Sequence, residues 1–589
     1  MSRRREQRRP STGDHRETRP RTREPRPDVW DPEQGVGPGL SLLFKLVALV
    51  VAVVALRLVW LQVIDAARLT ERAEAARTNA VTLTAKRGTI YDRDGNVLAI
   101  SQDCQTIYCN PEQVTDASQA AELIALALGG DEGDYEDLLT QDSTFVYVSR
   151  KVDEDVASGL SEALGTAGIE GVYFLADSKR VYPYGDVARQ VLGIVGTDGA
   201  GVTGVEALYD DVLSGTDGEM IMETGAGGTP IAGASSQVVE AQDGTDIVLS
   251  LDVDIQRVAE EELTSGVKQY SADSGSAVVT DPTNGEVLAI CSTPLYDPDD
   301  ESTIEEGATS LKPVSSSYEP GSIAKILTTA IALESGSATM DSSWTIPGYI
   351  EVGTSVVTDD DGRSSSMEMD LREILRRSSN VGAAFVAEEV IGAETFSEGF
   401  ASFGIGRATG IDFPGEVSGI VKTLDEYDDS TLGSMAFGQG LAIPMIQMVK
   451  AAGTIANGGV PTTPHLLVKK GDETVDYPEG DRVISEKTAS EVTDMMVTVV
   501  EEGTGTAAQV EGYTVAGKTG TGEMASEEGG YVEDKFTSSL LGFANADDPR
   551  VLVYVGINGT AYHGSESAAP VFSAIMGEAV VDMGVQPEG

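Results

Sequence analysis

Histidine and cysteine are scarce in this sequence. Its 589 residues include three of each. His15 lies in an arginine-rich N-terminal stretch, and neither His465 nor His563 is accompanied by the Gly-x-Ser-x-Gly signature of a nucleophile elbow. A Ser-His-Asp triad and a zinc site of His and Cys ligands are therefore unsupported. We expect no metal and no other cofactor.

Basic residues are also few. Lys and Arg total 41 against 95 Asp and Glu, which gives a formal net charge of −54 at pH 7. A surface of that sign repels the phosphate backbone, so nucleic acid is excluded as an expected partner. The acidic excess indicates a well-solvated exterior and identifies no particular ligand site.

The N-terminal part departs from this acidic average. Residues 1–38 are rich in Arg and Pro and contain no Lys, which predicts a disordered tail. Residues 39–64, GLSLLFKLVALVVAVVALRLVWLQVI, form an apolar run. As a helix with about 1.5 Å rise per residue, this run exceeds a hydrocarbon core of roughly 30 Å, and it is too long for the apolar region of a cleaved signal peptide.

The charges around this run predict its orientation. Arginines before the span and an acidic chain after it favour a cytoplasmic tail, with the main domains on the other side of the cell membrane. Arg57 lies inside the span, where a charge is costly. It either reaches the outer interface beside Trp60 or faces a partner helix.

One short stretch carries a candidate nucleophile. In YEPGSIAKILTTA, residues 318–330, the segment from Ser322 to Leu333 predicts a buried helix with Ser322 in its first turn. Residues three apart share a helix face, so the amine of Lys325 can reach the Ser322 hydroxyl and activate it. The alternative is that Lys325 extends to solvent. A second Ser-x-x-Lys match, at 265–268 in an expected helix end, shows that the spacing alone is weak.

Two further motifs follow in order. Ser-Ser-Asn occupies 378–380 in LRRSSNVGAAF, and Lys-Thr-Gly-Thr occupies 518–521 in VAGKTGTGE. Ser-x-x-Lys, Ser-x-Asn and Lys-Thr-Gly in this order are typical of serine acyltransferases of the penicillin-binding class, whose middle motif is commonly written with Asp where this chain has Ser379.

Beyond the span the chain divides into two parts. In residues 65–245, RGTIYDRDGNVLAIS predicts a hairpin turning at Asp94-Gly95, and glycine-rich stretches surround a short helix in GVTGVEALYDD. In residues 246–589, a hairpin turning at Asn284-Gly285, strands around TVAGKTGTG and an apolar helix near 571–581 predict an antiparallel sheet flanked by helices. Cys104 and Cys109 could form a local bridge, although strand parity opposes it.

These motifs together resemble the class B penicillin-binding proteins, the monofunctional peptidoglycan D,D-transpeptidases of cell division, elongation or sporulation. The resemblance runs from about residue 40 onward and rests on LRLVWLQV, RGTIYDRDGNVLA, GVTGVEALYD, YEPGSIAK, SSN, FGQGLAIPMIQ and KTGT. It implies a single transmembrane helix at 39–64, an α+β pedestal domain of the dimerisation type at 65–245 and an α/β penicillin-binding transpeptidase domain at 246–589.

The resemblance also implies roles in acyl transfer. Ser322 would attack the carbonyl between the two terminal D-alanines of a stem peptide. Lys325 would take the serine proton as a neutral amine, a state favoured by burial and by the nearby cation of Lys518. Ser378 would pass the proton to the leaving amine, and Asn380 would position Lys325 and the substrate amide.

The remaining implied roles concern substrate binding. Lys518 and Thr519 would hold the terminal carboxylate, and Gly520 would allow close approach of the strand. The backbone N–H groups of Ser322 and Thr521 would form the oxyanion hole.

The implied partners are peptidoglycan stem peptides ending in D-Ala-D-Ala, β-lactams, membrane lipid, a membrane-embedded glycan-polymerising glycosyltransferase and other division or elongation proteins. Two alternatives stay open at this point. One is a D,D-carboxypeptidase or a β-lactamase, which would pass the acyl group to water. The other is a non-catalytic β-lactam-binding scaffold of the division machinery. The cellular role, the stem-peptide chemistry and the oligomeric state are not determined by the sequence.

Overall fold

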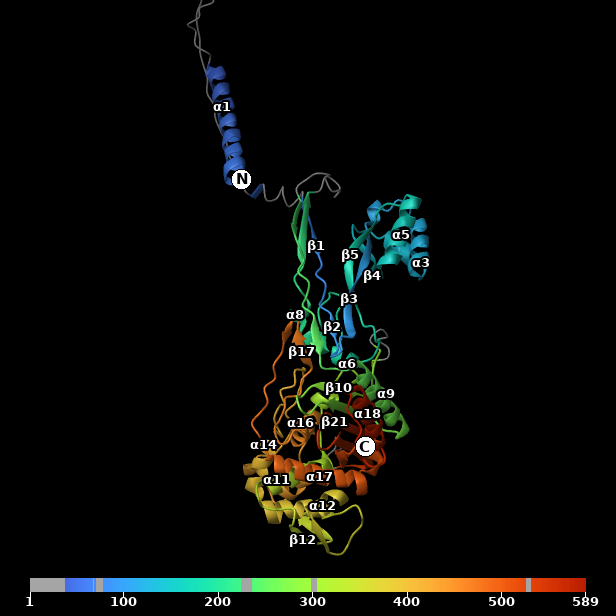
Figure 1. Cartoon of the computed structure of the whole chain (residues 1–589). Helices are drawn as coiled ribbons and strands as arrows, with labels where there is room; N and C mark the ends of the chain where they lie inside the picture. Colours follow the sequence, from blue (N-terminus) through green and yellow to red (C-terminus); the bar gives the residue numbers. More distant parts are fainter. Residues whose placement is uncertain are drawn as a thin grey trace, which may run out of the picture. The chain divides into compact units, whose positions relative to one another are not determined.

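The structure, a computed structural model, describes residues 38–66, 68–69, 78–223, 236–297, 304–525 and 531–588. The tail expected at 1–38 lies almost wholly outside the described residues, as does most of the second glycine-rich stretch, 224–235. The chain forms two compact units, one of residues 1–80 with 221–236 and one of residues 81–220 with 237–589 (Figure 1).

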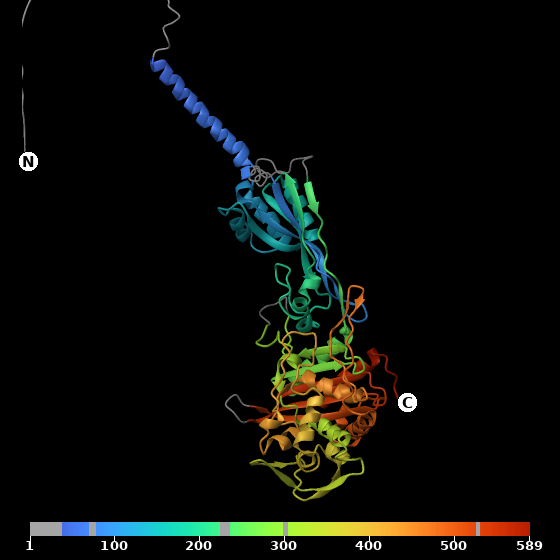
Figure 2. The ribbon, with the colours of Figure 1, turned by 90° about the vertical axis from the view of Figure 1, so that its left-hand side faces the viewer.

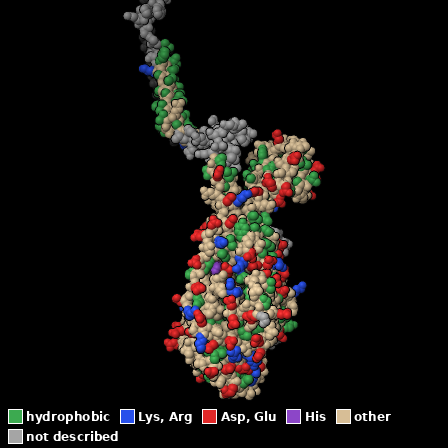
Figure 3. Space-filling view, viewed as in Figure 1, with side chains coloured by type: hydrophobic (Ala, Val, Ile, Leu, Met, Phe, Trp, Pro, Cys, Tyr) green, Lys and Arg blue, Asp and Glu red, His purple; other side chains and the backbone are tan. Residues whose placement is uncertain are grey.

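The first unit contains the expected apolar helix. Helix α1, Pro38–Val59, continues through a π-helical turn, Trp60–Ile64. Within the described part of the chain, Leu42–Ile64 is the one helix long and apolar enough to cross a membrane. Its hydrophobic side chains are exposed along its length, as the space-filling view shows (Figure 3). The prediction of a single apolar helix in this region is confirmed.

The pedestal is built around one long strand. β2, Ile90–Tyr91, turns at Asp94-Gly95 into β3, Val97–Cys109, and Gly95 has φ +87°, which a residue with a side chain rarely adopts. Further along, β3 pairs with β4 and β5, and three helices pack on this sheet around one hydrophobic core. The bounds of these elements are β4 Val146–Asp153, β5 Val172–Val181, α3 Ala117–Leu128, α4 Glu132–Leu139 and α5 Glu154–Ala167.

The two cysteines of β3 are not bridged. Cys104 and Cys109 are buried free thiols. An odd separation along a strand directs two side chains to opposite faces. Cys109 accordingly belongs to the core beneath the helices, whereas Cys104 does not. Strand geometry decides against the bridge left open by the sequence.

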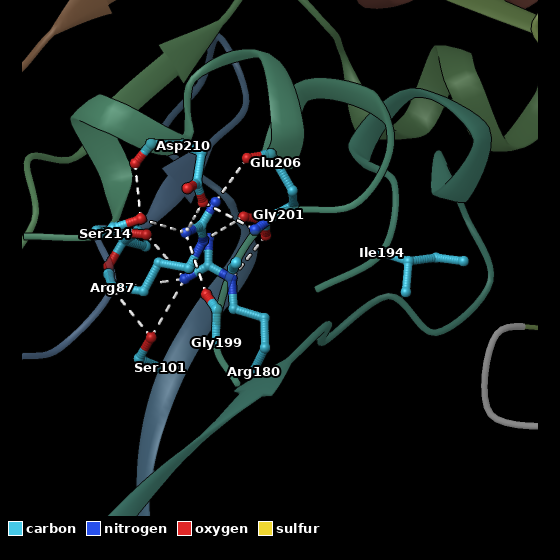
Figure 4. A network of polar contacts seen from close by, with 12 residues as sticks. Arg87, Ser101, Arg180, Ile194, Gly199, Gly201, Glu206, Asp210 and Ser214 are labelled. Atoms are coloured by element: carbon cyan, nitrogen blue, oxygen red, sulfur yellow. Dashed lines mark hydrogen bonds and ion pairs between the residues drawn. The ribbon is translucent and has the colours of Figure 1, made fainter. Parts of the chain in front are cut away.

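A buried ion-pair network lies where the pedestal strands meet the short helix expected in GVTGVEALYDD (Figure 4). Glu206, in α7, Gly204–Leu208, is fully buried and accepts hydrogen bonds from Arg87 Nε at 2.6 Å and Arg180 Nε at 2.7 Å. Arg87 also donates to Asp210, the first residue of α8, Asp210–Leu213, at 2.6 Å. Because each charge has an opposite partner, the cost of burying them is offset only while the network is complete.

The second part of the chain contains a five-stranded antiparallel sheet in the order β10-β9-β21-β20-β19 (Figure 2). The hairpin of β9 and β10 turns at Asn284-Gly285, as predicted, with φ +90° at Gly285. The strand bounds are β9 Ser274–Thr280, β10 Val287–Ser292, β19 Val515–Ala525, β20 Tyr531–Ala544 and β21 Val551–Thr560.

Alternating residues of this sheet enter two different cores. Val279 and Val555 pack with α9, Val253–Gln269, and α18, Ala568–Asp582. Val278 and Tyr554 belong instead to the larger core, which contains residues of α11, Lys325–Glu334, and of α16, Met445–Ala456. The expected antiparallel sheet flanked by helices is confirmed. The second Ser-x-x-Lys match lies in the last two turns of α9, as expected for a helix end.

The remaining α-helices and β-strands of the described residues complete the fold. They are β1 Thr78–Leu83, α6 Arg189–Leu192, β6 Gly218–Glu223, β7 Ser236–Val239, β8 Ile247–Leu249, α10 Lys312–Ser315, β11 Ser317–Tyr318, α11 Lys325–Glu334, β12 Ser343–Ile346, β13 Tyr349–Val352, β14 Ser355–Thr358, β15 Met367–Asp370, α12 Leu371–Arg377, α13 Asn380–Phe385, α14 Ala393–Ser402, α15 Thr431–Ala436, β16 Ile443–Pro444, α16 Met445–Ala456, β17 Leu467–Lys470, β18 Glu473–Thr474 and α17 Glu486–Glu502.

Candidate active site

Ser322 lies in a 3-10 turn, Gly321–Ala324, and the α-helix proper begins at Lys325. The sequence predicted one helix with Ser322 in its first turn, so the boundary differs. Side chains three apart eclipse in a 3-10 turn, which brings the serine directly toward the lysine. Gly321 has φ +58°, and a Cβ there would lie 3.1 Å from the Thr521 carbonyl oxygen. The Pro-Gly break therefore permits both the turn and its contact with β19.

Lys325 is almost completely buried, with 1% of its surface exposed, so it does not extend to solvent. Its Nζ lies 2.6 Å from the Ser378 carbonyl oxygen, 2.6 Å from Asn380 Oδ1 and 2.8 Å from Ser322 Oγ. A neutral amine has two N–H groups and one lone pair. The carbonyl and amide oxygens can only accept, so they use both N–H groups and leave the lone pair for the serine O–H.

The environment favours that neutral form. Burial lowers the pKa of Lys325 to about 7, while the negative charges of Asp360 and Asp359 act in the opposite direction. Near neutral pH the amine is therefore able to accept a proton.

Lys518 is a second buried amine of the same cluster. Its Nζ lies 2.9 Å from Ser378 Oγ and 2.8 Å from the Thr519 carbonyl oxygen. Burial, and after it the charge of Lys325, lower the pKa of Lys518 well below its usual value. From the sequence, a Lys518 cation was expected to help keep Lys325 neutral. Burial disfavours the charge on each amine, and their mutual repulsion disfavours charging both at once.

Gly520 lies where two backbones approach closely. It faces Ser539 of β20, and a Cβ on it would lie 2.3 Å from Ser539 Oγ and 3.1 Å from the Pro320 carbonyl oxygen. A side chain at this position would separate β19 from the turn that holds Ser322. On the same strand the Thr519 hydroxyl lies 2.7 Å from that of Thr504, a residue that the sequence did not single out.

The middle motif joins α12 to α13. Ser378 ends α12 with φ +59°, and the Ser379 hydroxyl caps α13 by accepting from the Gly382 N–H. The same hydroxyl donates to the buried carboxylate of Asp359 at 2.8 Å. Where the commoner form of the motif has an Asp, this chain thus has a serine that bonds an Asp from another segment. Sequence reasoning missed Asp359 because it is one of three consecutive aspartates.

The stretch 512–519 also has the Gly-x₄-Gly-Lys-Thr spacing of a phosphate-binding loop. In the structure the Lys518 end of this stretch belongs to the extended strand β19, which runs on to Ala525 paired with β20, so no helix begins at the lysine. The spacing therefore does not create a nucleotide site.

The fold and the convergence of the three motifs define a serine acyltransferase of the penicillin-binding class. Residues 275–577 match the penicillin binding protein transpeptidase domain family, and residues 82–249 match the penicillin-binding protein dimerisation domain family. The chain belongs to the class B penicillin-binding proteins.

Individual relatives agree with this assignment. The chain is 32% identical over 563 residues to stage V sporulation protein D of Bacillus subtilis, covering 93% of this chain and 86% of that protein. It is 30% identical over 559 residues to the peptidoglycan D,D-transpeptidase FtsI of Escherichia coli K12, covering 93% and 92%. Penicillin-binding protein 2X of Streptococcus thermophilus is 26% identical, and its crystal structure matches with a TM-score of 0.74 over 85% of this chain and 80% of that one.

Family membership confirms the expected fold class and enzyme class, and the apolar helix together with these relatives indicates a single-pass membrane protein. The structure brings the side chains of all three motifs into contact. The domain boundaries at 64/65 and 245/246 and the role of each site residue stay predictions.

Proposed function

We propose that this protein cross-links peptidoglycan stem peptides as a D,D-transpeptidase, through an acyl-enzyme on Ser322, and that β-lactams acylate the same serine. Its family and the relative named as a peptidoglycan D,D-transpeptidase support this activity. The observation that carries the assignment of residues is the buried Lys325 amine, whose lone pair is left for the Ser322 hydroxyl at 2.8 Å.

In the first half-reaction, Ser322 Oγ bonds to the carbonyl carbon between the two terminal D-alanines as its proton passes to Lys325 Nζ. The C–N bond then breaks. The departing amine takes a proton relayed from Lys325 through Ser378, whose hydroxyl lies 3.2 Å from Lys325 Nζ. Free D-alanine leaves, and the shortened stem peptide remains esterified to Ser322.

In the second half-reaction, an amine of a neighbouring stem peptide attacks the ester carbonyl. Its proton returns to Ser322 Oγ by way of Lys325 as the C–O bond breaks, so the catalyst is restored. A hydrolase would need a further base to activate water. The side-chain partners of Lys325 in the described chain are Ser322, Ser378 and Asn380, none of them a carboxylate.

Recognition of the donor rests on its carboxylate. Lys518 and Thr519 would receive that group through charge-assisted hydrogen bonds, and the anion would restore the ammonium form of Lys518. The backbone N–H groups of Ser322 and Thr521 would stabilise the oxyanion, since the turn and β19 lie side by side here.

Placement in the membrane follows from charge. The arginine-rich tail would lie in the cytoplasm and the pedestal and transpeptidase domains outside it. A glycan-polymerising glycosyltransferase in the membrane would supply the strands, in contact with α1 around Arg57.

The test is covalent labelling with a fluorescent penicillin, followed by mass mapping of the labelled peptide. We expect the label on Ser322 and none in Ser322→Ala. Ser265→Ala is the matched control, because it has the same Ser-x-x-Lys spacing on α9 and should label normally. Label persisting in Ser322→Ala would refute the assignment.

A further inference from the structure

The turn that follows α17 contacts the end of α12, just before the middle motif, and the strand of the lysine-threonine-glycine motif. The Thr504 N–H donates to the Arg376 carbonyl oxygen at 3.3 Å, two residues before Ser378. Gly503 lies so close to the same oxygen that a Cβ would be 2.6 Å from it. On its other side, Thr504 Oγ lies 2.7 Å from Thr519 Oγ. The turn thus connects the end of α12 with the lysine-threonine-glycine strand.

Which of the two hydroxyls, Thr504 or Thr519, donates the hydrogen bond between them has a functional consequence. A threonine hydroxyl has one proton to donate and two lone pairs to accept with. If Thr519 donated its proton to Thr504, none would remain for a substrate carboxylate. If Thr504 donates instead, the Thr519 proton is free, and a hydroxyl that accepts one hydrogen bond becomes a stronger donor of the next.

The two residues differ in burial. Thr519 is 6% exposed, and its hydroxyl oxygen lies 3.5 Å from Nζ of Lys518, the preceding residue of β19. Thr504 is half-buried on a turn whose backbone is held by Arg376. The turn therefore brings a second hydroxyl to Thr519 at a fixed distance.

We infer that Thr504 is a positioning residue for carboxylate recognition. Its hydroxyl donates to Thr519 Oγ and directs the single Thr519 proton at the carboxylate of the donor peptide or of a β-lactam. This inference rests on the proposed function, in which Thr519 receives that carboxylate.

The experiment compares two forms of one penicillin, the free acid and its methyl ester, on the full chain in detergent. Thr504→Val removes the hydroxyl and keeps the shape of the side chain. We expect the second-order rate constant for acylation by the acid to fall about fivefold, because Thr519 loses the neutral hydrogen bond that orients its hydroxyl and strengthens it as a donor to the carboxylate. Acylation by the ester should stay nearly unchanged, and Thr504→Ser should restore the acid reaction.

Thr506→Val is the matched control, since Thr506 is exposed two residues further on and should leave both rates unchanged. The inference would be overturned if Thr504→Val left the ratio of the two acylation rate constants, acid to ester, unchanged. An equal fall of both rate constants is one such result and would indicate a structural role only. If Thr504→Val loses its cooperative thermal transition and is therefore unfolded, Thr504→Ala takes its place, and the ratio of the acid to the ester rate constant is compared in the same way. Ser322→Ala in the same assay distinguishes failure of this inference from failure of the proposed function, because label that persists in Ser322→Ala refutes the proposed function itself.

Discussion

The protonation of Lys325 should control how fast the protein reacts with penicillin as pH changes. Burial lowers the pKa of this amine to about 7 from 10.5, and the neutral form is the one that accepts the Ser322 proton. For a group with that pKa the neutral fraction is about 90% at pH 8, about 10% at pH 6 and about 1% at pH 5. The acylation rate should therefore fall about tenfold per unit below pH 7 and level off above it.

The titratable groups around this amine are Lys518 from β19, whose own pKa is lowered by burial, and the two aspartates that follow β14, Asp359 and Asp360. Because both carboxylates raise the pKa of Lys325, Asp359→Asn should move the midpoint to lower pH. Asp361→Asn is the control, since its carboxylate pairs with the partly exposed Arg377 at 3.0 Å.

The assay is stopped-flow acylation at saturating penicillin from pH 5 to 9, which separates the chemical step from carboxylate binding. The penicillin carboxyl stays ionised over this range, so it adds no titration of its own. A rate that is flat from pH 5 to 8, or one that still rises tenfold per unit at pH 9, would refute the neutral-lysine reasoning.

Two further predictions concern the pedestal and the fate of the acyl-enzyme. Glu206→Gln takes from the buried Arg180 its charged partner and leaves Arg87 paired with Asp210 alone, so we expect a loss of about 3–5 kcal/mol in pedestal stability. The loss should be seen as a lower thermal transition and earlier proteolysis. Asp211→Asn, on the exposed side of α8, is the control, and equal transitions in the two variants would contradict the network's importance. The penicilloyl-enzyme should deacylate far more slowly than it forms, and a thioester donor with D-amino acid acceptors should give exchange products. Rapid multiple-turnover hydrolysis of penicillin, with no aminolysis product at any acceptor concentration, would favour the hydrolytic alternative.

The parts of the fold that local rules govern could be predicted from the sequence. The turns at Asp94-Gly95 and Asn284-Gly285 were predictable because glycine accepts the positive φ that such turns require. The approach of Lys325 to Ser322 was expected from their spacing on a helix together with the two motifs that follow, since the spacing alone also occurs at 265–268.

What escaped prediction depends on contacts between distant segments. Nothing local to Asp359 or Thr504 distinguishes either from its neighbours, since one stands in a run of aspartates and the other in a Gly-Thr repeat. Their partners, Ser379 and Thr519, come from other elements of the fold. The near-complete burial of both lysine side chains, Lys325 and Lys518, could not be predicted either, because it depends on how distant segments pack around them.

The strand that carries the lysine-threonine-glycine motif is the last of its sheet, paired with β20 on one side only. The other side of β19 therefore presents main-chain donors and acceptors that an extended peptide can use as if it were a sixth strand. Recognition of this kind reads the direction and extension of a peptide rather than its side chains. In the proposed reaction, an enzyme built on such an edge would tolerate different residues in the middle of the peptide that it joins, while the ends proposed to meet Ser322 and Lys518 would stay fixed.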